Sequence, residues 1–318
     1  MTAQIPTPIT PQTLVLPRTV TRPRFRIGGR RTITPGQQVV LQLMCLAIAA
    51  TVLFPLAWVL SMALDPRNIS RPTGLDLVPP GATLDAFARV LAKPTLNPVS
   101  FWELARNSLE IALIVSITSI VLGVLAAYAF SRLKFSGREV LMLGILAVLM
   151  LPAVATIAPL FVSLNKIQIG TFNLRNSIPG VALAVTAGQL PFAIWNMKGY
   201  IDTIPRELEE AAAVDGASKF QTFLRVILPL STPVIAVTAF FGFLAGWTEF
   251  YFSWTFLNQP RDFTLSMALN GMVGQYAGST PWSDFAAFAI LVALPVSAVY
   301  LYLQKYIISG LTVGGVKG

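Results

Sequence analysis

Six long apolar stretches constrain this chain more than any other feature of its sequence. Each runs for about 20 residues or more, which is the length of a helix that crosses the hydrocarbon core of a bilayer. They lie at residues 39–64, 107–130, 140–164, 178–197, 233–256 and 286–308. A backbone surrounded by lipid must satisfy its own polar groups, so such stretches cross as helices. The sequence therefore predicts an all-α, polytopic membrane protein with six transmembrane helices.

The composition agrees with this prediction and excludes several classes of protein. Hydrophobic residues make up 54% of the 318 residues and charged residues only 12%, against about 25% charged residues in ordinary soluble domains. The chain has no His and a single Cys, Cys45, which excludes histidine-based catalysis, histidine metal sites and an intramolecular disulfide. It also lacks the glycine-rich loop with Gly-Lys-Ser/Thr that cradles ATP phosphates. We therefore expect a chain that is not an enzyme, with no catalytic residues, no metal and no cofactor.

The distribution of basic residues predicts the orientation in the membrane. Residues 1–38 hold six Arg and no acidic residue, and their Pro- and Thr-rich composition indicates a disordered basic tail that touches anionic lipid. With that tail inside, the cytoplasmic segments 1–38, 131–139, 198–232 and 305–318 carry 15 of the 23 Lys and Arg residues. The positive-inside rule then predicts that both termini are cytoplasmic. No nucleic-acid-binding motif accompanies the positive charge, so we expect no nucleic-acid partner.

This orientation divides the chain into a tail and one membrane domain. The domain covers residues 39–318 and contains the outer loops 65–106 and 257–285, the inner loop 198–232 and a cytoplasmic tail at 309–318.

The inner loop 198–232 has the most informative pattern. Asp202 or Thr203 is a candidate N-cap for a helix with Pro205 in its first turn, and Gly216 is placed to end that helix with a positive φ. Ser218 and Gln221 have the spacing of a capping box for a second helix, expected to stop before a proline. The pattern predicts a helix–turn–helix elbow whose small, acidic tip suits insertion into a cleft of another protein.

The same loop resembles a known motif. Glu210-Ala211-Ala212, then Gly216, then Val226-Ile227-Leu228-Pro229 is similar to the EAA loop of ABC-importer permeases, with Val226 in the place of the usual Ile. The segments 128–138 and 309–318 resemble those of the carbohydrate-uptake permeases, the maltose/maltodextrin type above all. The resemblance implies a MetI-like permease fold and a multi-pass protein of the bacterial inner membrane. It also implies an ATPase-coupling role for the loop residues Glu210, Ala211, Ala212, Asp215, Gly216, Leu228 and Pro229.

The family resemblance further implies partners and a substrate class. Such a permease pairs with a second, different permease subunit, with two ATP-binding cassette subunits and with an extracytoplasmic sugar-binding protein. The expected function is ATP-driven import of maltose/maltodextrin-type oligosaccharides, for which this chain forms half of the path. Trehalose, another α-glucoside or glycerol phosphate is the alternative substrate. An ion-coupled secondary transporter is a weaker alternative, because it predicts paired intramembrane charges and inverted repeats that the sequence does not display.

Two groups of residues are candidates for contact with the sugar or its binding protein. Trp247, Glu249 and Tyr251 combine aromatic faces with a carboxylate inside the fifth stretch, where ionisable residues are usually functional; a structural hydrogen bond by Glu249 is the alternative. Gln275 and Tyr276 lie in the outer loop 257–285. An amide and an aromatic ring are suited to sugar hydroxyls or to a sugar-binding protein.

Overall fold

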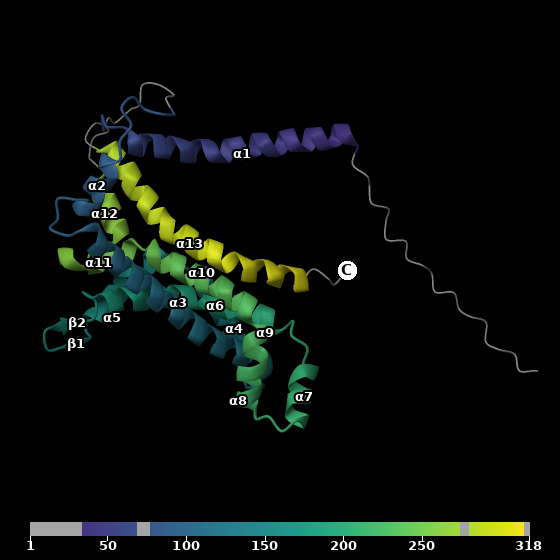
Figure 1. Ribbon diagram of the computed structural model, residues 1–318. Helices are drawn as coiled ribbons and strands as arrows, with labels where there is room; N and C mark the ends of the chain where they lie inside the picture. Colours follow the sequence, from purple (N-terminus) through teal and green to yellow (C-terminus); the bar gives the residue numbers. More distant parts are fainter. Residues whose placement is uncertain (1–33, 69–76, 274–279, 315–318) are drawn as a thin grey trace, which may run out of the picture. The chain divides into compact units, whose positions relative to one another are not determined.

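The computed structural model describes residues 34–68, 77–273 and 280–314, with side chains through Tyr306. Almost all of its regular structure is helical (Figure 1). The longer elements in chain order are α1 (Pro35–Leu64), α2 (Asp85–Ala92), α3 (Phe101–Arg132), α4 (Arg138–Leu149), α5 (Ile157–Asn165), α6 (Ile178–Ile201), α7 (Glu207–Val214), α10 (Thr232–Trp247), α11 (Tyr251–Phe256), α12 (Leu265–Gly271) and α13 (Trp282–Gly314). The short ones are β1 (Gln168–Ile169), β2 (Phe172–Asn173), α8 (Lys219–Thr222), α9 (Leu228–Leu230), a π turn at Phe223–Ile227 and 3-10 turns at Ala153–Thr156 and Pro260–Asp262.

The chain divides into two units, Met1–Val52 and Leu53–Gly318. In the first, the described part of α1 is an apolar helix without a buried residue. The predicted tail 1–38 falls almost wholly outside the described residues, and α1 begins at Pro35. The second unit holds the remaining helices and all of the buried core.

Five helices of the described chain are long and apolar enough to cross a membrane, and a bent pair brings the number to six. The bent pair is the predicted third span, in which α4 and the segment Ala153–Asn165 meet at 104°. The predicted span is therefore sharply bent. Pro152 has no N–H to continue the hydrogen-bond ladder and disfavours helical backbone in the residue before it, so α4 ends at Leu149.

Glycines allow α3 and α10 to pack with their backbones nearly touching. A Cβ on Gly246 would lie 2.6 Å from the Cα of Ala112, and one on Gly242 would lie 2.9 Å from the Cα of Ser116. The Ser116 hydroxyl also donates to the carbonyl oxygen of Ala239 at 2.9 Å. Small residues and interhelical hydrogen bonds of this kind hold helices together where lipid weakens the hydrophobic drive.

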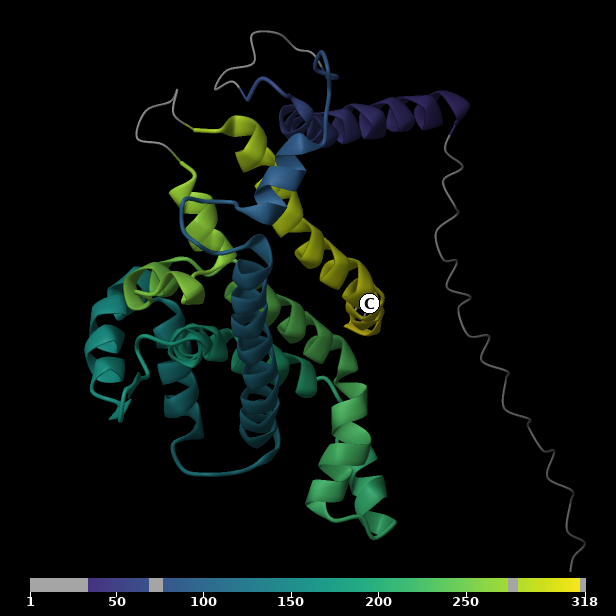
Figure 2. The ribbon, with the colours of Figure 1, turned by 60° about the vertical axis from the view of Figure 1, so that its left-hand side comes forward.

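The third helix of the central bundle, α6, packs on another side of α3. Gly123 of α3 faces the side chains of Ala193 and Met197, and the hydroxyls of Thr118 and Thr186 lie 3.1 Å apart. From Leu109 to Leu125 the exposed side chains of α3 are all apolar, as a lipid-facing surface requires. The helices α3, α6 and α10 therefore form the core of the second unit (Figure 2).

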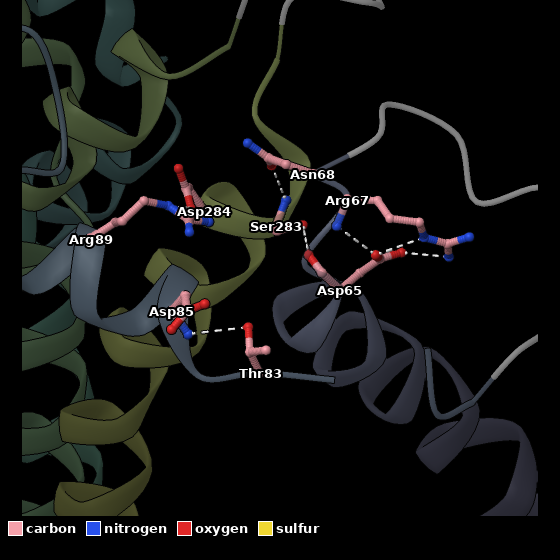
Figure 3. Close-up of polar contacts among 8 residues, drawn as sticks. All are labelled: Asp65, Arg67, Asn68, Thr83, Asp85, Arg89, Ser283 and Asp284. Atoms are coloured by element: carbon pink, nitrogen blue, oxygen red, sulfur yellow. Dashed lines mark hydrogen bonds and ion pairs between the residues drawn. The ribbon is translucent and has the colours of Figure 1, made fainter. Parts of the chain in front are cut away.

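Polar contacts join three elements at one end of this bundle, as Figure 3 shows. Arg89 of α2 forms an ion pair with Asp284 of α13 at 2.6 Å. Ser283 donates its hydroxyl to the carbonyl oxygen of Asp65 at 2.7 Å and its N–H to the side-chain oxygen of Asn68 at 2.9 Å. The side-chain hydrogen bond from Arg67 holds the pKa of Asp65 below its ordinary value. This network fixes the segment after α1 against the start of α13.

Candidate functional site

The α7–α8 elbow projects beyond the opposite end of the bundle in both ribbon views (Figures 1 and 2). Helix α7 ends at Val214, and Gly216, which follows the C-cap Asp215, has the predicted positive φ, at 81°. The N–H of Ala217 donates to the carbonyl of Ala212 at 2.9 Å, and the N–H of Gly216 donates to that of Ala213 at 3.0 Å. These two bonds form a Schellman motif, which satisfies the last carbonyls of the helix and turns the chain sharply.

The second arm of the elbow begins as predicted. The N–H of Gln221 donates to the Ser218 hydroxyl at 3.3 Å, and the Ser218 N–H donates to the Gln221 side-chain oxygen at 2.8 Å. Both halves of the capping box are therefore present at the start of α8. The box fixes the direction of the chain as it leaves the turn.

The predicted helix stop before Pro229 was wrong. The chain stays helical through the π turn Phe223–Ile227 and through α9, so Pro229 lies inside a helical run. The N–H of Leu228 donates to the carbonyl of Phe223, five residues earlier. This π turn lies directly before the proline, and the helical run continues past it to Leu230.

The predicted N-cap of the first arm was also wrong. Helix α7 begins at Glu207, beyond Pro205, and has no side-chain cap. Asp202 instead accepts hydrogen bonds from the Ser131 hydroxyl and from the Lys198 ammonium group, each at 2.6 Å. Burial raises the pKa of Asp202, but the hydrogen bonds from Lys198 and Ser131 together outweigh it, and the pKa is lowered.

The predicted coupling residues lie mostly on the surface of the elbow. Ala212 and Leu228 are half-buried, and the exposed members are Glu210, Ala211, Asp215, Gly216 and Pro229. Two large apolar side chains that the sequence reasoning missed are exposed beside them, Val214 by 88% and Phe220 by 67%. Their positions beside the predicted turn and outside the apolar stretches could have marked both as exposed apolar residues. An apolar patch on a projecting turn is typical of a protein–protein contact.

The polar side-chain atoms of Trp247 and Glu249 form hydrogen bonds to the backbone of this chain. The indole N–H of Trp247 donates to the carbonyl of Val292 at 3.0 Å. The Glu249 carboxylate is buried and accepts the N–H groups of Phe252 at 2.7 Å and Ser253 at 2.8 Å. Glu249 thus caps the first turn of α11, whereas the Tyr251 side chain is 59% exposed. A sugar-path role for these three residues stays a prediction, and Gln275 and Tyr276 lie outside the described residues.

Replacing Glu249 with alanine is expected to destabilise α11. The substitution leaves two buried N–H groups without their acceptor, at a cost of about 1–3 kcal/mol. Glu249→Gln keeps one acceptor oxygen and is expected to cost less. Thermal unfolding of the purified protein in detergent measures both changes. Equal midpoints for wild type and Glu249→Ala would contradict the capping role.

Comparison with known proteins identifies the family. Residues 119–313 match the family described as "Binding-protein-dependent transport system inner membrane component". The chain belongs to this family. It is therefore a multi-pass permease of the inner membrane, as the resemblance to the EAA loop implied, and not an enzyme.

Relatives of the chain span almost its whole membrane domain. It is 34% identical to the "Trehalose/maltose transport system permease protein MalG" of Thermococcus litoralis, over 89% of this chain and 98% of the relative. It is 36% identical to the "Maltose/maltodextrin transport system permease protein MalG" of Yersinia pestis, over 86% and 91%. It is 34% identical to the "Galactooligosaccharides transport system permease protein GanQ" of Bacillus subtilis, over 85% and 92%.

A solved structure supports the fold. The model superposes with a TM-score of 0.69 on a chain of a bacterial ABC transporter involved in the import of the polysaccharide alginate. The match covers 85% of this chain and 95% of that chain at 23% identity. The predicted ABC-importer permease fold is thereby confirmed.

Proposed function

We propose that this permease carries oligosaccharides of the maltose/maltodextrin type in an ATP-driven importer. Two of the relatives have maltose in their names, and both align over more than four fifths of the present chain. The complete importer contains a second permease subunit, two ATP-binding cassette subunits and an extracytoplasmic sugar-binding protein. Both termini of the chain and the α7–α8 elbow lie on the cytoplasmic side.

The observation that carries the coupling role is the exposed tip of the elbow. Small residues, the acidic side chain of Glu210 and the apolar side chains of Val214 and Phe220 are exposed on the projecting α7–α8 elbow. Alanine allows a partner backbone to approach closely, Glu210 can pair with an arginine, and the apolar residues gain from desolvation. This surface suits docking on the ATP-binding subunits, whose closure would then move the elbow.

Another relative supports a second substrate class. The GanQ relative has "galactooligosaccharides" in its name and is about as similar to this chain as the others. Its similarity places galactooligosaccharides beside trehalose, other α-glucosides and glycerol phosphate as alternative cargo.

Uptake by the reconstituted complex tests the proposed function. The permease pair, the ATP-binding subunits and the sugar-binding protein are placed in proteoliposomes with internal ATP and given labelled maltotriose. We expect ATP-dependent accumulation that unlabelled maltose reduces and that galactobiose does not. Accumulation that only galactobiose reduces would replace the proposed sugar, and accumulation driven by an ion gradient without ATP would overturn the importer class.

The outer loop offers a separate test of binding-protein contact. We propose that Gln275 and Tyr276 touch the sugar-binding protein, because an amide and an aromatic ring can pair with its polar surface. Replacing both residues with alanine is expected to lower the binding-protein stimulation of ATP hydrolysis several-fold. The exposed Gln259 of the same loop serves as the control for a neutral Gln→Ala change. Unchanged stimulation in the double variant would contradict the contact.

A further inference from the structure

Helix α7 is held to the bundle by a polar contact and not by apolar packing. None of its eight residues is buried. A cavity of about 260 Å³ lies between α7, α8 and the end of α3, with Tyr128, Ala213 and Thr222 among the lining residues. A helix that docks on another protein and lacks an apolar anchor needs another connection to transmit force.

Arg132, the last residue of α3, supplies that connection. Its guanidinium group pairs with the carboxylate of Glu209 in the first turn of α7. A second nitrogen donates to the carbonyl oxygen of Ile204 at 2.8 Å, and a third donates to the Ser131 hydroxyl at 3.1 Å. The planar fork of an arginine can hold several acceptors in a fixed arrangement, which a lysine cannot do.

The contact is shielded from water and continues into α6. The side chain of Arg132 is 7% exposed and that of Glu209 is 18% exposed. The Ser131 hydroxyl passes the network on to Asp202, which also binds Lys198 of α6. A shielded, multiply bonded ion pair is costly to break, because one partner is left with an uncompensated charge.

We propose that Arg132 is the positioning residue that transmits movement of the elbow to α3. The inference rests on the proposed coupling role of the elbow. When the docked tip moves, Glu209 pulls on the guanidinium group at the end of α3, the helix that packs on both α6 and α10. Arg132 and Glu209 thereby give α7 a direct route to the transmembrane core, in addition to the route along the chain.

Replacing Arg132 with glutamine tests the proposal in the reconstituted complex. The expected result is uncoupling: ATP hydrolysis persists while sugar uptake falls, so the ATP consumed per sugar rises at least about tenfold. Glu209→Gln is expected to act in the same direction, the double variant to be no worse than the more severe single variant, and Arg132→Lys to recover part of the coupling. The matched control is Arg138→Gln, which removes the same charge from a residue whose side chain, within the part of the chain that the structure describes, hydrogen-bonds only to the carbonyl of Leu133.

A distance measurement reports on the contact itself. Spin labels on Val214→Cys and Phe135→Cys, in a Cys45→Ser background, follow the elbow relative to the end of α3; all three positions are exposed. We expect one narrow distance distribution in the parent protein and a broad one in Glu209→Gln, which retains the Arg132 bonds to Ile204 and Ser131 and is expected to fold. The proposal would be overturned if Arg132→Gln consumed ATP per sugar within twofold of wild type. It would also be overturned if the distribution of spin-label distances in Glu209→Gln were the same as in the parent protein. A wild-type complex that shows no ATP-dependent uptake would instead overturn the proposed function.

Discussion

Replacing Gly216 with valine is expected to reduce sugar uptake at least about tenfold while the importer still assembles. The residue has a φ of 81°, which a β-branched side chain adopts only with strain of roughly 1–2 kcal/mol or more. A Cβ at this position would meet nothing within 4 Å, so the damage comes from the backbone alone. Relief of the strain breaks the Schellman motif and changes the angle between α7 and α8.

A second glycine provides the matched control for this prediction. Gly137 also has a φ of 81° and open space around it, yet it lies between α3 and α4, outside the elbow. Gly137→Val therefore introduces the same strain without altering the proposed docking tip, and its uptake is expected to stay near wild type. Uptake by labelled-sugar assay measures both variants. Equal losses in the two variants would show that the strain acts on folding and not on coupling.

The second large effect is expected at the contact between α3 and α10. Gly246→Ala would place a Cβ 2.6 Å from the Cα of Ala112 and 2.9 Å from its nitrogen. These are backbone atoms that no rotamer change can move, so we expect destabilisation at or above the upper end of the usual overpacking cost of about 1–3 kcal/mol. Ala112→Gly is expected not to rescue the variant, because the clash does not involve the Ala112 side chain.

Thermal unfolding in detergent and the yield of monodisperse protein measure this effect. The control is Gly188→Ala in α6, where an added Cβ meets nothing within 4 Å. Because alanine favours a helix over glycine by about 1 kcal/mol, the control is expected to be neutral or stabilising. A Gly246→Ala protein as stable as the control would contradict the close approach of α3 and α10.

The elbow could be predicted from the sequence where its determinants are local. The positive φ of Gly216 and the capping box of Ser218 and Gln221 depend on residues within a few positions of one another. The membrane spans were predictable for a similar reason, since length and polarity alone decide whether a segment can cross lipid. The bend of 104° in the third span could not be predicted. A proline marks the position at which a helix is weakened, but the packing of neighbouring helices determines the angle of the bend.

Features that depend on distant residues had no signal in the sequence. Asp202 is a good N-cap residue in isolation, but its carboxylate accepts a hydrogen bond from Ser131, 71 positions earlier. Arg132 and Glu209 are 77 positions apart, and local periodicity places them in different elements. The stop predicted at Pro229 failed because the helix continues through the proline after a π turn, an outcome that helix propensities do not contain.

Cross-linking from the tip of the elbow tests the central claim that this turn couples the permease to ATP hydrolysis. A benzophenone probe is attached to Val214→Cys in the Cys45→Ser background, and the complete importer is irradiated with and without ATP. The account predicts an adduct between the permease and an ATP-binding subunit whose yield changes when ATP is bound, and no such adduct from a probe at the exposed Leu96 at the other end of the domain. An assembled, transporting complex in which the Val214 probe yields no adduct with an ATP-binding subunit would contradict it.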